Sequence, residues 1–308
     1  MDWLALFWWF LHAESGLHED YMAGKKQNLP AKHHIVPEFF IKRFSSRADA
    51  FVYVYDSEFG KLSNEPKAAS AICYIRHLYT LDVAQSQLVV LETMFSFFET
   101  QWAEIFRMLE TDTDADAIDA ALSEVPEIEK ILRLFIACQF WRHPERRELA
   151  IEYAEKLPDL FEGMADDDLV SVLDLHTIEE IAEARDMEDA ARIIQYFLLP
   201  LLTYQTPFAP GERFHITKIP DGYGHDLICS DGPLIGDTIE QVFNGEGTKI
   251  FPFSKDRMLL LGRDGCSVTP QEVEVSQAQL FASAPKYVFA SSIAALSRHL
   301  GDRGHPSN

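Results

Sequence analysis

Apolar side chains recur at helical spacing through the middle of the chain, where one follows another every three or four positions. Helices are predicted here over 88–109, 128–141, 146–163, 167–175 and 178–204. Between the first two of them, residues 112–119 carry acidic side chains at alternate positions, which indicates an exposed loop. The middle of the chain is therefore expected to form a helical block.

The pattern at the two ends of the chain is that of strands. Residues 50–56 read AFVYVYD, an alternation of aromatic and β-branched side chains. After Pro207, short apolar runs bounded by Gly, Pro or Asp predict strands over 214–219, 226–229, 249–253 and 258–261. The stretch 277–300 is rich in small residues and predicts a helix interrupted at Pro285.

Neither set of strands is long enough to bury its apolar face alone. We therefore expect the strand at 50–56 to share a sheet with strands from 214–261. The predicted fold class is α+β, with a large helical middle block and a sheet built from N-terminal and C-terminal strands. Residues 32–308 are expected to form this single domain, preceded by an apolar, Trp-rich leader and linker over 1–31.

The chain has 308 residues and a formal net charge of −22, with 27 Lys and Arg against 49 Asp and Glu. This sign excludes a generic nucleic-acid coat protein, whose surface would be basic throughout, but it leaves room for a local basic site. Between residues 92 and 190 there are 27 acidic and 8 basic residues, so nearly the whole acidic excess falls on the helical block. Solvated helix faces explain it better than an acidic binding surface.

The leader contains a dense apolar run, Trp3–Leu11, that ends at His12. A membrane span needs roughly 20 apolar residues, so no transmembrane segment is predicted. The run fits a helix packed on the body or on a second subunit, and it also fits an anchor at a membrane interface. Packing is the simpler interpretation, and it makes a homo-oligomer or a protein partner the expected role of the leader. Removal of residues 1–24 should leave the body folded but alter oligomeric state or solubility.

Cysteines are sparse and widely separated, at Cys73, Cys138, Cys229 and Cys266. No pair has the spacing of a metal knuckle, and the chain is too long for a disulfide scaffold. A reducing cytoplasm is the expected location.

The sharpest local feature is the run Lys32–Phe44, which reads KHHIVPEFFIKRF. Neutral imidazole can ligate a metal or act as a base, and charged imidazole can bind phosphate. Because consecutive side chains point in different directions, His33 and His34 are expected to have different roles, one at a site and one anchoring the loop. Glu38 is close enough in sequence to orient either ring. A buried structural pair at a helix start is the alternative.

Basic residues surround this run. Between Lys25 and Arg47 there are six bases and one acid, in a chain that is strongly negative overall. The local excess suggests an anionic ligand such as phosphate or a nucleic-acid backbone, with Lys42 and Arg43 as the phosphate-binding candidates. Pairing of these bases with the acidic helices is the alternative.

A second feature lies on the predicted helix 128–141 and just after it. Gln139 and Arg142 are three positions apart and therefore share one face of an otherwise apolar helix. Polar groups near a buried face need partners, because unpaired burial is costly. The two side chains can reach a ligand, or they can tie down a loop such as the segment of His33 and His34.

The third feature is the sequence CSDGP, at the end of a predicted strand. Ser230 can bond phosphate, and Asp231 can hold a divalent metal or set the tautomer of a histidine. The same residues also make a good turn, in which the Asp accepts backbone N–H groups.

Together these features resemble the bacterial domain-of-unknown-function family 4238. The likeness spans roughly residues 32–292 and rests on these matches: His33-His34-x-Val36-Pro37, Phe40-Ile41, Phe44, Tyr55-Asp56, Gln139-x-x-Arg142-x-Pro144, Ser230-Asp231-x-Pro233, Pro252-Phe253-Ser254, Ala284 and Tyr287-Val288-Phe289. The resemblance implies one domain with a composite site, and it brings no established reaction. The residues that it implies converge are His33, His34, Gln139, Arg142, Ser230 and Asp231.

Two classes of function follow. The first is a metal-dependent phosphodiester hydrolase, most simply a nuclease of a bacterial toxin or an antiviral defence effector. Its catalytic candidates are His33, His34, Gln139, Arg142 and Ser230, with Asp231 and Glu38 at a divalent metal, magnesium or manganese before zinc. The second is a non-catalytic module that senses a nucleotide or holds a protein partner through the same polar cluster. Carboxylates that point into the pocket favour catalysis, whereas an Asp231 that only caps a turn favours binding.

Either class predicts that His33 or His34, Arg142 and Asp231 line one pocket. Arg142 is expected to pair with Asp231 when the site is empty, or to turn toward a phosphate when it is filled. A purely structural network that locks the opening segment onto the helical block is the alternative.

Overall fold

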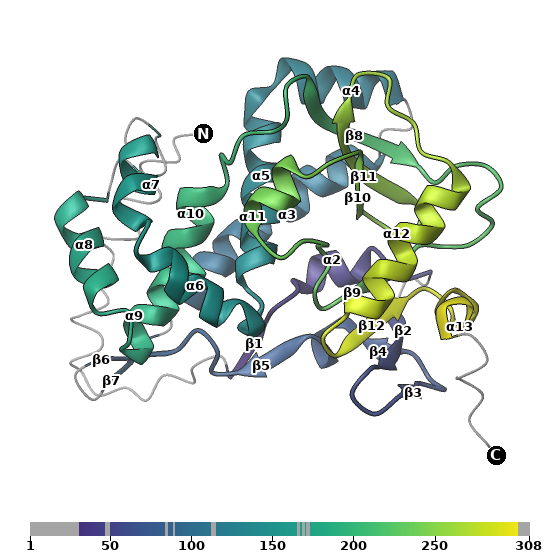
Figure 1. Ribbon diagram of the computed structural model, residues 1–308. Coiled ribbons are helices and arrows are strands. Elements are labelled where there is room, and N and C mark those ends of the chain that lie inside the picture. The colour runs from purple at the N-terminus through teal and green to yellow at the C-terminus, as the bar shows by residue number, and fades with distance from the viewer. Residues whose placement is uncertain are drawn as a thin grey trace. The chain divides into compact units, whose positions relative to one another are not determined.

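Figure 1 shows the computed structural model of the chain. It describes residues 31–46, 50–83, 86–88, 90–111, 115–164, 167, 170 and 173–300. Residues 1–30 are outside this set, so the expectations for the packing of the leader and for its removal lie outside the described residues. Among the described helices, none is long and apolar enough to cross a membrane.

The described residues fall into two compact units. Unit 1 contains the described residues up to His33, together with Arg76–Phe98 and Pro144–Tyr204. Unit 2 contains His34–Ile75, Glu99–His143 and the described residues from Gln205 onward. The boundary thus falls between the two adjacent histidines.

The largest sheet belongs to unit 2 and has the strand order β3-β2-β12-β9, with β4 also paired to β2. Its strands are β2 Phe51–Asp56, β3 Lys61–Leu62, β4 Lys67–Ala68, β9 Cys229–Ser230 and β12 Tyr287–Ala290. Val52 and Val54 are buried and their neighbours in β2 are partly exposed, which is the alternation that the sequence shows. The sheet joins strands from both ends of the chain and confirms the α+β class.

Two helices, α12 (Pro270–Ser283) and α13 (Ile293–Leu300), pack against this sheet. Apolar side chains from these helices, from β12 and from the residue before β9 form one buried cluster: Ile228, Leu280, Ala284, Val288, Ala290, Ala295 and Leu296. The predicted helix over 277–300 is interrupted at Pro285 as expected, but the interruption contains a strand that was not predicted. Tyr287–Ala290 is a strand because its register with both β2 and β9 satisfies its backbone groups, while Pro285 ends the helical stretch before it.

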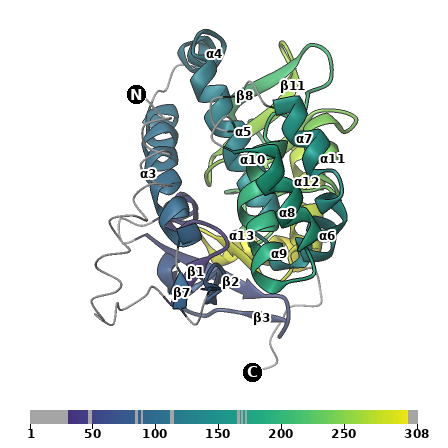
Figure 2. The ribbon, with the colours of Figure 1, turned by 90° about the vertical axis from the view of Figure 1, so that its left-hand side faces the viewer.

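A second sheet of unit 2 is antiparallel, in the order β10-β11-β8. Its strands are β8 Glu212–Lys218, β10 Lys249–Pro252 and β11 Arg257–Arg263. Of the described strands from 214–261, only β9 shares the sheet of β2, so the prediction was wrong for the other three. They bury their apolar side chains without β2, because helix α4 (Ala115–Glu124) packs on β8, as Figure 1 and Figure 2 both show.

Helix α4 also corrects the predicted loop at 112–119. Residues 112–114 lie outside the described set, but the chain is helical from Ala115. Ile118 and Leu122 are one helical turn apart and both buried, so their burial holds the acidic segment in a helix.

Three further helices complete unit 2: α2 (Glu38–Lys42), α5 (Pro126–Trp141) and α11 (Ile239–Asn244), and the second half of α3 (Val90–Thr111) joins them from Glu99. Helix α5 begins with Pro126 in its first turn, followed by two glutamates, which suits a helix N-terminus. Its other face is buried among aromatic rings, where Phe135 contacts Trp102 and Phe106.

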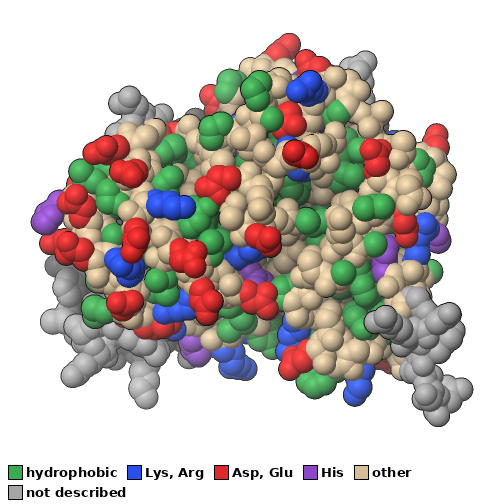
Figure 3. Space-filling model, viewed as in Figure 1, with side chains coloured by type: hydrophobic (Ala, Val, Ile, Leu, Met, Phe, Trp, Pro, Cys, Tyr) green, Lys and Arg blue, Asp and Glu red, His purple; other side chains and the backbone are tan. Residues whose placement is uncertain are grey.

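Unit 1 is mainly helical. Its helices are α6 Arg147–Ala154, α7 Leu157–Met164, α8 Leu175–Glu183, α9 Glu188–Ile193 and α10 Leu199–Thr203, and it has a small ladder of β6 Leu81–Val83 with β7 Ser86–Leu88. The short strands β1 (Lys32–His34) and β5 (Tyr74–Arg76) pair with each other where the chain passes between the units. Figure 3 shows acidic side chains scattered over the surface of α6–α9, as solvated helix faces should be.

Three predicted helices of unit 1 were wrong in their bounds. The stretch 146–163 is broken between α6 and α7, and the described residues of 167–174 are not helical. Helix α8 begins only after Asp174, whose carboxylate caps it by accepting the N–H of Thr177. The stretch 178–204 is split, and a π-helical turn at Ile194–Leu198 precedes Pro200. A proline has no N–H to donate, which favours such local departures from α-helical bonding.

Candidate functional site

The two adjacent histidines have different partners. His33, in unit 1, is completely buried, and its Nδ1 accepts the backbone N–H of Tyr79 at 2.8 Å. Its ring also stacks on that of Tyr79, with 5.2 Å between the centroids. A neutral imidazole that accepts at Nδ1 carries its proton on Nε2. His33 therefore anchors the opening segment, as expected for one of the pair.

His34 belongs to unit 2 and lies next to a carboxylate. Its Nε2 is 3.7 Å from Oε1 of Glu38, and the other oxygen of Glu38 is 3.3 Å from Nζ of Lys42. The His34 ring also contacts Tyr74 edge to face. The start of α2 thus supplies the acid that the spacing of His34 and Glu38 suggested.

Arg142 joins the end of α5 to the opening segment. The residue is 1% exposed, and its Nη2 donates to the backbone carbonyl of His34 at 2.6 Å and to Oε1 of Glu99 at 2.8 Å. Charge-assisted bonds of this kind are strong where water is excluded. The contact with His34 is the structural tie that the sequence analysis gave as one alternative, and the pairing of Arg142 with Asp231 stays a prediction.

Gln139 lies one turn before Arg142 and has a different environment. Its side chain is 3% exposed, and neither its Oε1 nor its Nε2 has a hydrogen-bond partner among the described residues. Native proteins satisfy nearly all buried polar groups, and each unsatisfied one costs about 1–3 kcal/mol. The packing of α5 therefore does not explain why a carboxamide is present at position 139.

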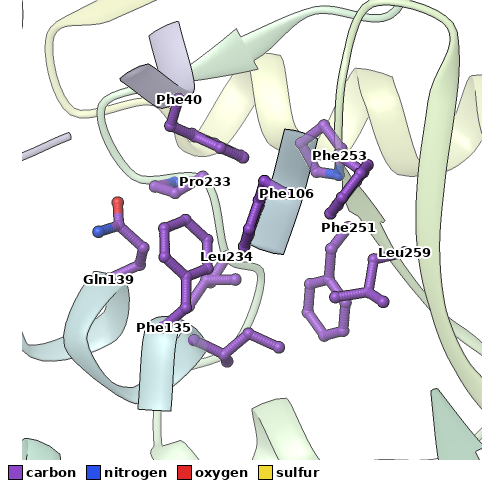
Figure 4. A pocket seen from close by; sticks show the side chains of 11 residues that line it. Phe40, Phe106, Phe135, Gln139, Pro233, Leu234, Phe251, Phe253 and Leu259 are labelled. Atoms are coloured by element: carbon purple, nitrogen blue, oxygen red, sulfur yellow. The ribbon is translucent and has the colours of Figure 1, made fainter. Parts of the chain in front are cut away.

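The side chain of Gln139 borders a small pocket of unit 2, shown in Figure 4. The other lining residues are apolar, and five of them are phenylalanines: Phe40, Phe106, Phe135, Phe251 and Phe253, with Ile136, Pro233, Leu234, Pro252 and Leu259 completing the wall. In Figure 4 the Gln139 side chain leaves α5 on the side of Pro233. With a volume of about 20 Å³, the pocket has room for one water-sized molecule.

Ser230 and Asp231 lie at the end of β9, two positions before Pro233 of the pocket wall. The Asp231 N–H donates to the carbonyl of Tyr287 at 2.9 Å, and Oδ1 accepts the N–H of Lys286 at 3.2 Å. Asp231 therefore caps the turn that leads into β12. The hydroxyl of Ser230 is fully buried, and its Oγ has no hydrogen-bond partner among the described residues.

A buried thiol connects this turn to the opening segment. The carbonyl of Cys73 accepts the N–H of Ile35 at 2.8 Å. Burial, followed by the charge of Asp231, raises the pKa of the Cys73 thiol well above its usual range. The backbone of Cys73 is thus bonded to the opening segment, and its thiol stays protonated at neutral pH.

The two residues expected to hold a metal have protein partners in the structure. The carboxylate of Asp231 caps a turn, and Glu38 is shared by His34 and Lys42. Within the described part of the chain, no group of three or more His, Cys, Asp or Glu side chains is placed to hold a metal ion. A divalent metal stays a prediction to be tested in solution.

The two basic candidates differ in their surroundings. Lys42 is about half exposed and pairs with Glu38, whereas the side chain of Arg43 is only 7% exposed. Arg43 lies against Phe253 and Phe106, two rings of the pocket wall. Of the other four basic residues of this stretch, Lys32 is exposed, and Lys25, Lys26 and Arg47 lie outside the described residues.

Sequence reasoning missed one residue of this cluster, the ion-pair partner Glu99. A signal was present, because Glu99 lies four positions after Phe95 and three before Trp102, on the buried face of its helix. The carboxylate of Glu99 among apolar side chains is as unusual as the buried guanidinium of Arg142, with which it pairs. The structure thus brings His34, Glu38, Glu99 and Arg142 together by direct contacts and places Gln139 at the neighbouring pocket.

Comparison with known proteins confirms the family that the motifs suggested. The family model described as "Protein of unknown function (DUF4238)" matches residues 32–279 of the chain. No curated protein and no solved structure matches the chain. The match includes all the residues of the candidate site.

Proposed function

Since the chain belongs to the DUF4238 family, whose description gives no function, we propose a function from its own residues: the protein is a binding module for a small planar ligand of the nucleotide class. The aromatic pocket of unit 2 would take the base. Phenylalanine rings stack on bases of any sequence, and a carboxamide offers one donor and one acceptor side by side, as base edges require.

The observation that carries this proposal is the carboxamide of Gln139. It is almost fully buried without a partner, at the edge of a wall that is otherwise apolar. A methionine of similar length would fill this place without the cost of two unsatisfied polar atoms. A ligand that hydrogen-bonds the amide explains why the polar group is there.

Ligand entry requires the pocket to open, because its present volume of about 20 Å³ excludes a base. The segment of Pro233 and Leu234 forms one wall and is the element best placed to move, since it is a loop between β9 and α11. Binding would then select or induce an opened form of unit 2.

The test is the melting temperature of the full chain with a panel of nucleoside monophosphates at millimolar concentration. A ligand at about 100 times its Kd stabilises the folded form by about 2.7 kcal/mol, which is readily measured. We expect at least one nucleotide to raise the melting temperature of the parent and to have no effect on Gln139→Met.

Gln277→Met is the matched control. Gln277 is 1% exposed in the same unit, but its Oε1 accepts the N–H of Ile228 at 2.7 Å. This variant should keep the response to the nucleotide, although its own melting temperature falls. A parent that responds to no nucleotide, or a Gln139→Met variant that responds as the parent does, would contradict the proposal.

Phosphodiester cleavage is the second candidate, and the pair of His34 and Glu38 favours it. A carboxylate 3.7 Å from Nε2 can orient an imidazole and stabilise its charged form, as a general base needs. A nuclease with this residue would suit a toxin or an antiviral defence effector. The assay is cleavage of single-stranded DNA and RNA with Mg²⁺ or Mn²⁺ added. Activity that His34→Ala abolishes at an unchanged melting temperature would support cleavage, and an inactive parent would contradict it.

Metal binding has its own test. If Asp231 is a ligand, Mg²⁺ or Mn²⁺ should raise the melting temperature of the parent and not that of Asp231→Ala. Asp231→Ala also removes a turn cap and so lowers the melting temperature of the variant by itself. The quantity to compare is therefore the change in melting temperature that the metal causes in each protein.

Location and assembly follow from other parts of the chain. The described cysteines are free thiols, three of them buried, which suits the reducing cytoplasm that we propose as the location. We propose the apolar run of the leader as the contact with a second copy or another protein, to be tested by the oligomeric state after removal of residues 1–24.

A further inference from the structure

Arg43, which ends α2, is a buried cation at the wall of the aromatic pocket. Its Nε donates to the carbonyl of Phe253 at 2.9 Å, and its Nη1 pairs with Glu110 at 3.0 Å. The guanidinium carbon is 4.4 Å from the ring centroid of Phe253 and 5.2 Å from that of Phe106. Because both rings line the pocket, Arg43 and the pocket share a wall.

The third nitrogen of this guanidinium is not satisfied. Nη2 of Arg43 is buried and has no hydrogen-bond partner among the described residues. Its ion-pair partner Glu110 is 39% exposed and contacts only Nη1, so water weakens that pair. The N–H groups of Nη2 are therefore available to an acceptor.

A second buried arginine lies beside the first. Arg257 is 7% exposed and follows a turn whose first residue, Phe253, is bound by Arg43. The backbone N–H groups of Phe253 and Ser254 both donate to the carbonyl of Arg257, which closes that turn. The turn therefore holds the two guanidinium-bearing residues in one region of unit 2.

Two carboxylates, Glu110 and Asp256, act on Arg43 together with Arg257, so an anion here would meet the buried guanidinium of Arg43 and not an excess of positive charge. Burial is the main cause that lowers the pKa of Arg43 to about 10, and the charge of Arg257 lowers it as well, whereas Glu110 and Asp256 act in the opposite direction. Oδ1 of Asp256 accepts a hydrogen bond from the hydroxyl of Ser254 at 2.8 Å, so part of its capacity to accept hydrogen bonds is already used. The guanidinium of Arg43 offers planar N–H donors of the kind that bind phosphate. Arg257, whose Nη1 donates to the carbonyl of Leu109 at 3.0 Å, adds a second positive charge.

We propose that Arg43 and Arg257 form an anion subsite adjoining the aromatic pocket, and that it takes the phosphate of the ligand. As far as it names the ligand, this inference rests on the proposed function. Of the two phosphate-binding candidates from the sequence, it keeps Arg43 and replaces the exposed Lys42 by the buried Arg257. A base stacked among the phenylalanines and a phosphate at Arg43 would lie on two sides of the same rings.

The first experiment uses inorganic phosphate as the probe, with the full chain and chloride at matched ionic strength as the reference. We expect phosphate to raise the melting temperature of the parent in a saturable way. Arg43→Lys keeps the positive charge but loses the planar N–H donors of the guanidinium, so phosphate should no longer raise its melting temperature. Phosphate should still raise the melting temperature of Lys42→Gln. A parent that responds equally to chloride, or a Lys42→Gln variant that loses the rise, would overturn the subsite.

The second experiment needs only the parent, and so it decides the matter even if Arg43→Lys does not fold. A nucleoside monophosphate should bind about tenfold more tightly or better than its nucleoside, because only the nucleotide can use the arginine pair. Equal affinities would overturn the subsite and leave the proposed function standing. Binding of phosphate without binding of any nucleoside or nucleotide would leave the subsite standing and overturn the proposed function.

Discussion

At the scale of single residues, Gln139 and Arg142 show how far a sequence can lead. Two polar side chains on an apolar helix were enough to mark both as needing partners. The sequence could not assign the partners, because Glu99 and His34 are distant in the chain and reach Arg142 only through the fold. Nor could it separate the two roles, since an arginine that is bound to Glu99 and His34 and a glutamine without such partners look alike in a helical pattern.

Glu99→Gln should destabilise the protein by about 1–3 kcal/mol, because it leaves the buried charge of Arg142 with a neutral partner. Denaturant unfolding measures this loss. The reference is Glu155→Gln, which breaks the exposed pair of Glu155 with Arg185 and should cost less than about 1 kcal/mol. Equal losses in the two variants would show that the pair of Arg142 and Glu99 contributes no more to the free energy of unfolding than an exposed ion pair does.

At the scale of elements, helices α3 and α5 and most of the strands, among them β8, β10 and β11, were predicted correctly, whereas β12 and α4 were missed. The stripes of α3 and α5 and the alternation of β2 were recognised, because many residues contribute to each. Strand β12 was missed, because a run of four residues is stabilised by its neighbours β2 and β9 and not by its own pattern. Helix α4 was missed for the related reason that two buried residues, Ile118 and Leu122, outweigh its acidic surface.

Helix α12 starts with a capping box, in which Thr269 Oγ1 accepts the N–H of Glu272 and Glu272 accepts the N–H of Thr269. Thr269→Ala should therefore destabilise the protein by about 1 kcal/mol at neutral pH. Unfolding of the parent and the variant in urea measures the difference.

The same box gives a pH dependence. The bonds from the backbone and the hydroxyl of Thr269 lower the pKa of Glu272 below its ordinary value. A carboxyl with a lowered pKa contributes stability above the pKa of the unfolded chain and loses it as the pH falls through the folded-state pKa. The difference between parent and Thr269→Ala should thus shrink in acid. A difference that stays constant or grows as the pH falls would contradict the box.

At the scale of the whole molecule, the α+β class could be read from the order of the patterns, but the division of the chain could not. Unit 1 and unit 2 are each built from segments that the other interrupts, and the boundary between His33 and His34 leaves no mark in composition. Net charge is a property of the whole chain that composition does give, and it has a consequence for stability.

With a net charge of −22, the folded chain repels itself more than the expanded unfolded chain does. Salt should therefore raise the melting temperature between low ionic strength and about 0.15 M, where the screening length falls to about 8 Å. Sodium chloride is the suitable salt, because it has no phosphate-like geometry. A melting temperature that falls over this range would mean that attractive ion pairs outweigh the repulsion.

The most direct measurement compares the free energies of unfolding of the parent, Gln139→Met and Gln277→Met in the absence of any ligand. Both glutamines are almost fully buried in unit 2, but only Gln277 has a partner for its amide. If the amide of Gln139 serves a ligand, Gln139→Met should be as stable as the parent or more stable, and Gln277→Met should lose about 1–3 kcal/mol. If Gln139→Met loses as much stability as Gln277→Met, the amide serves the fold, and the binding pocket built around it is wrong.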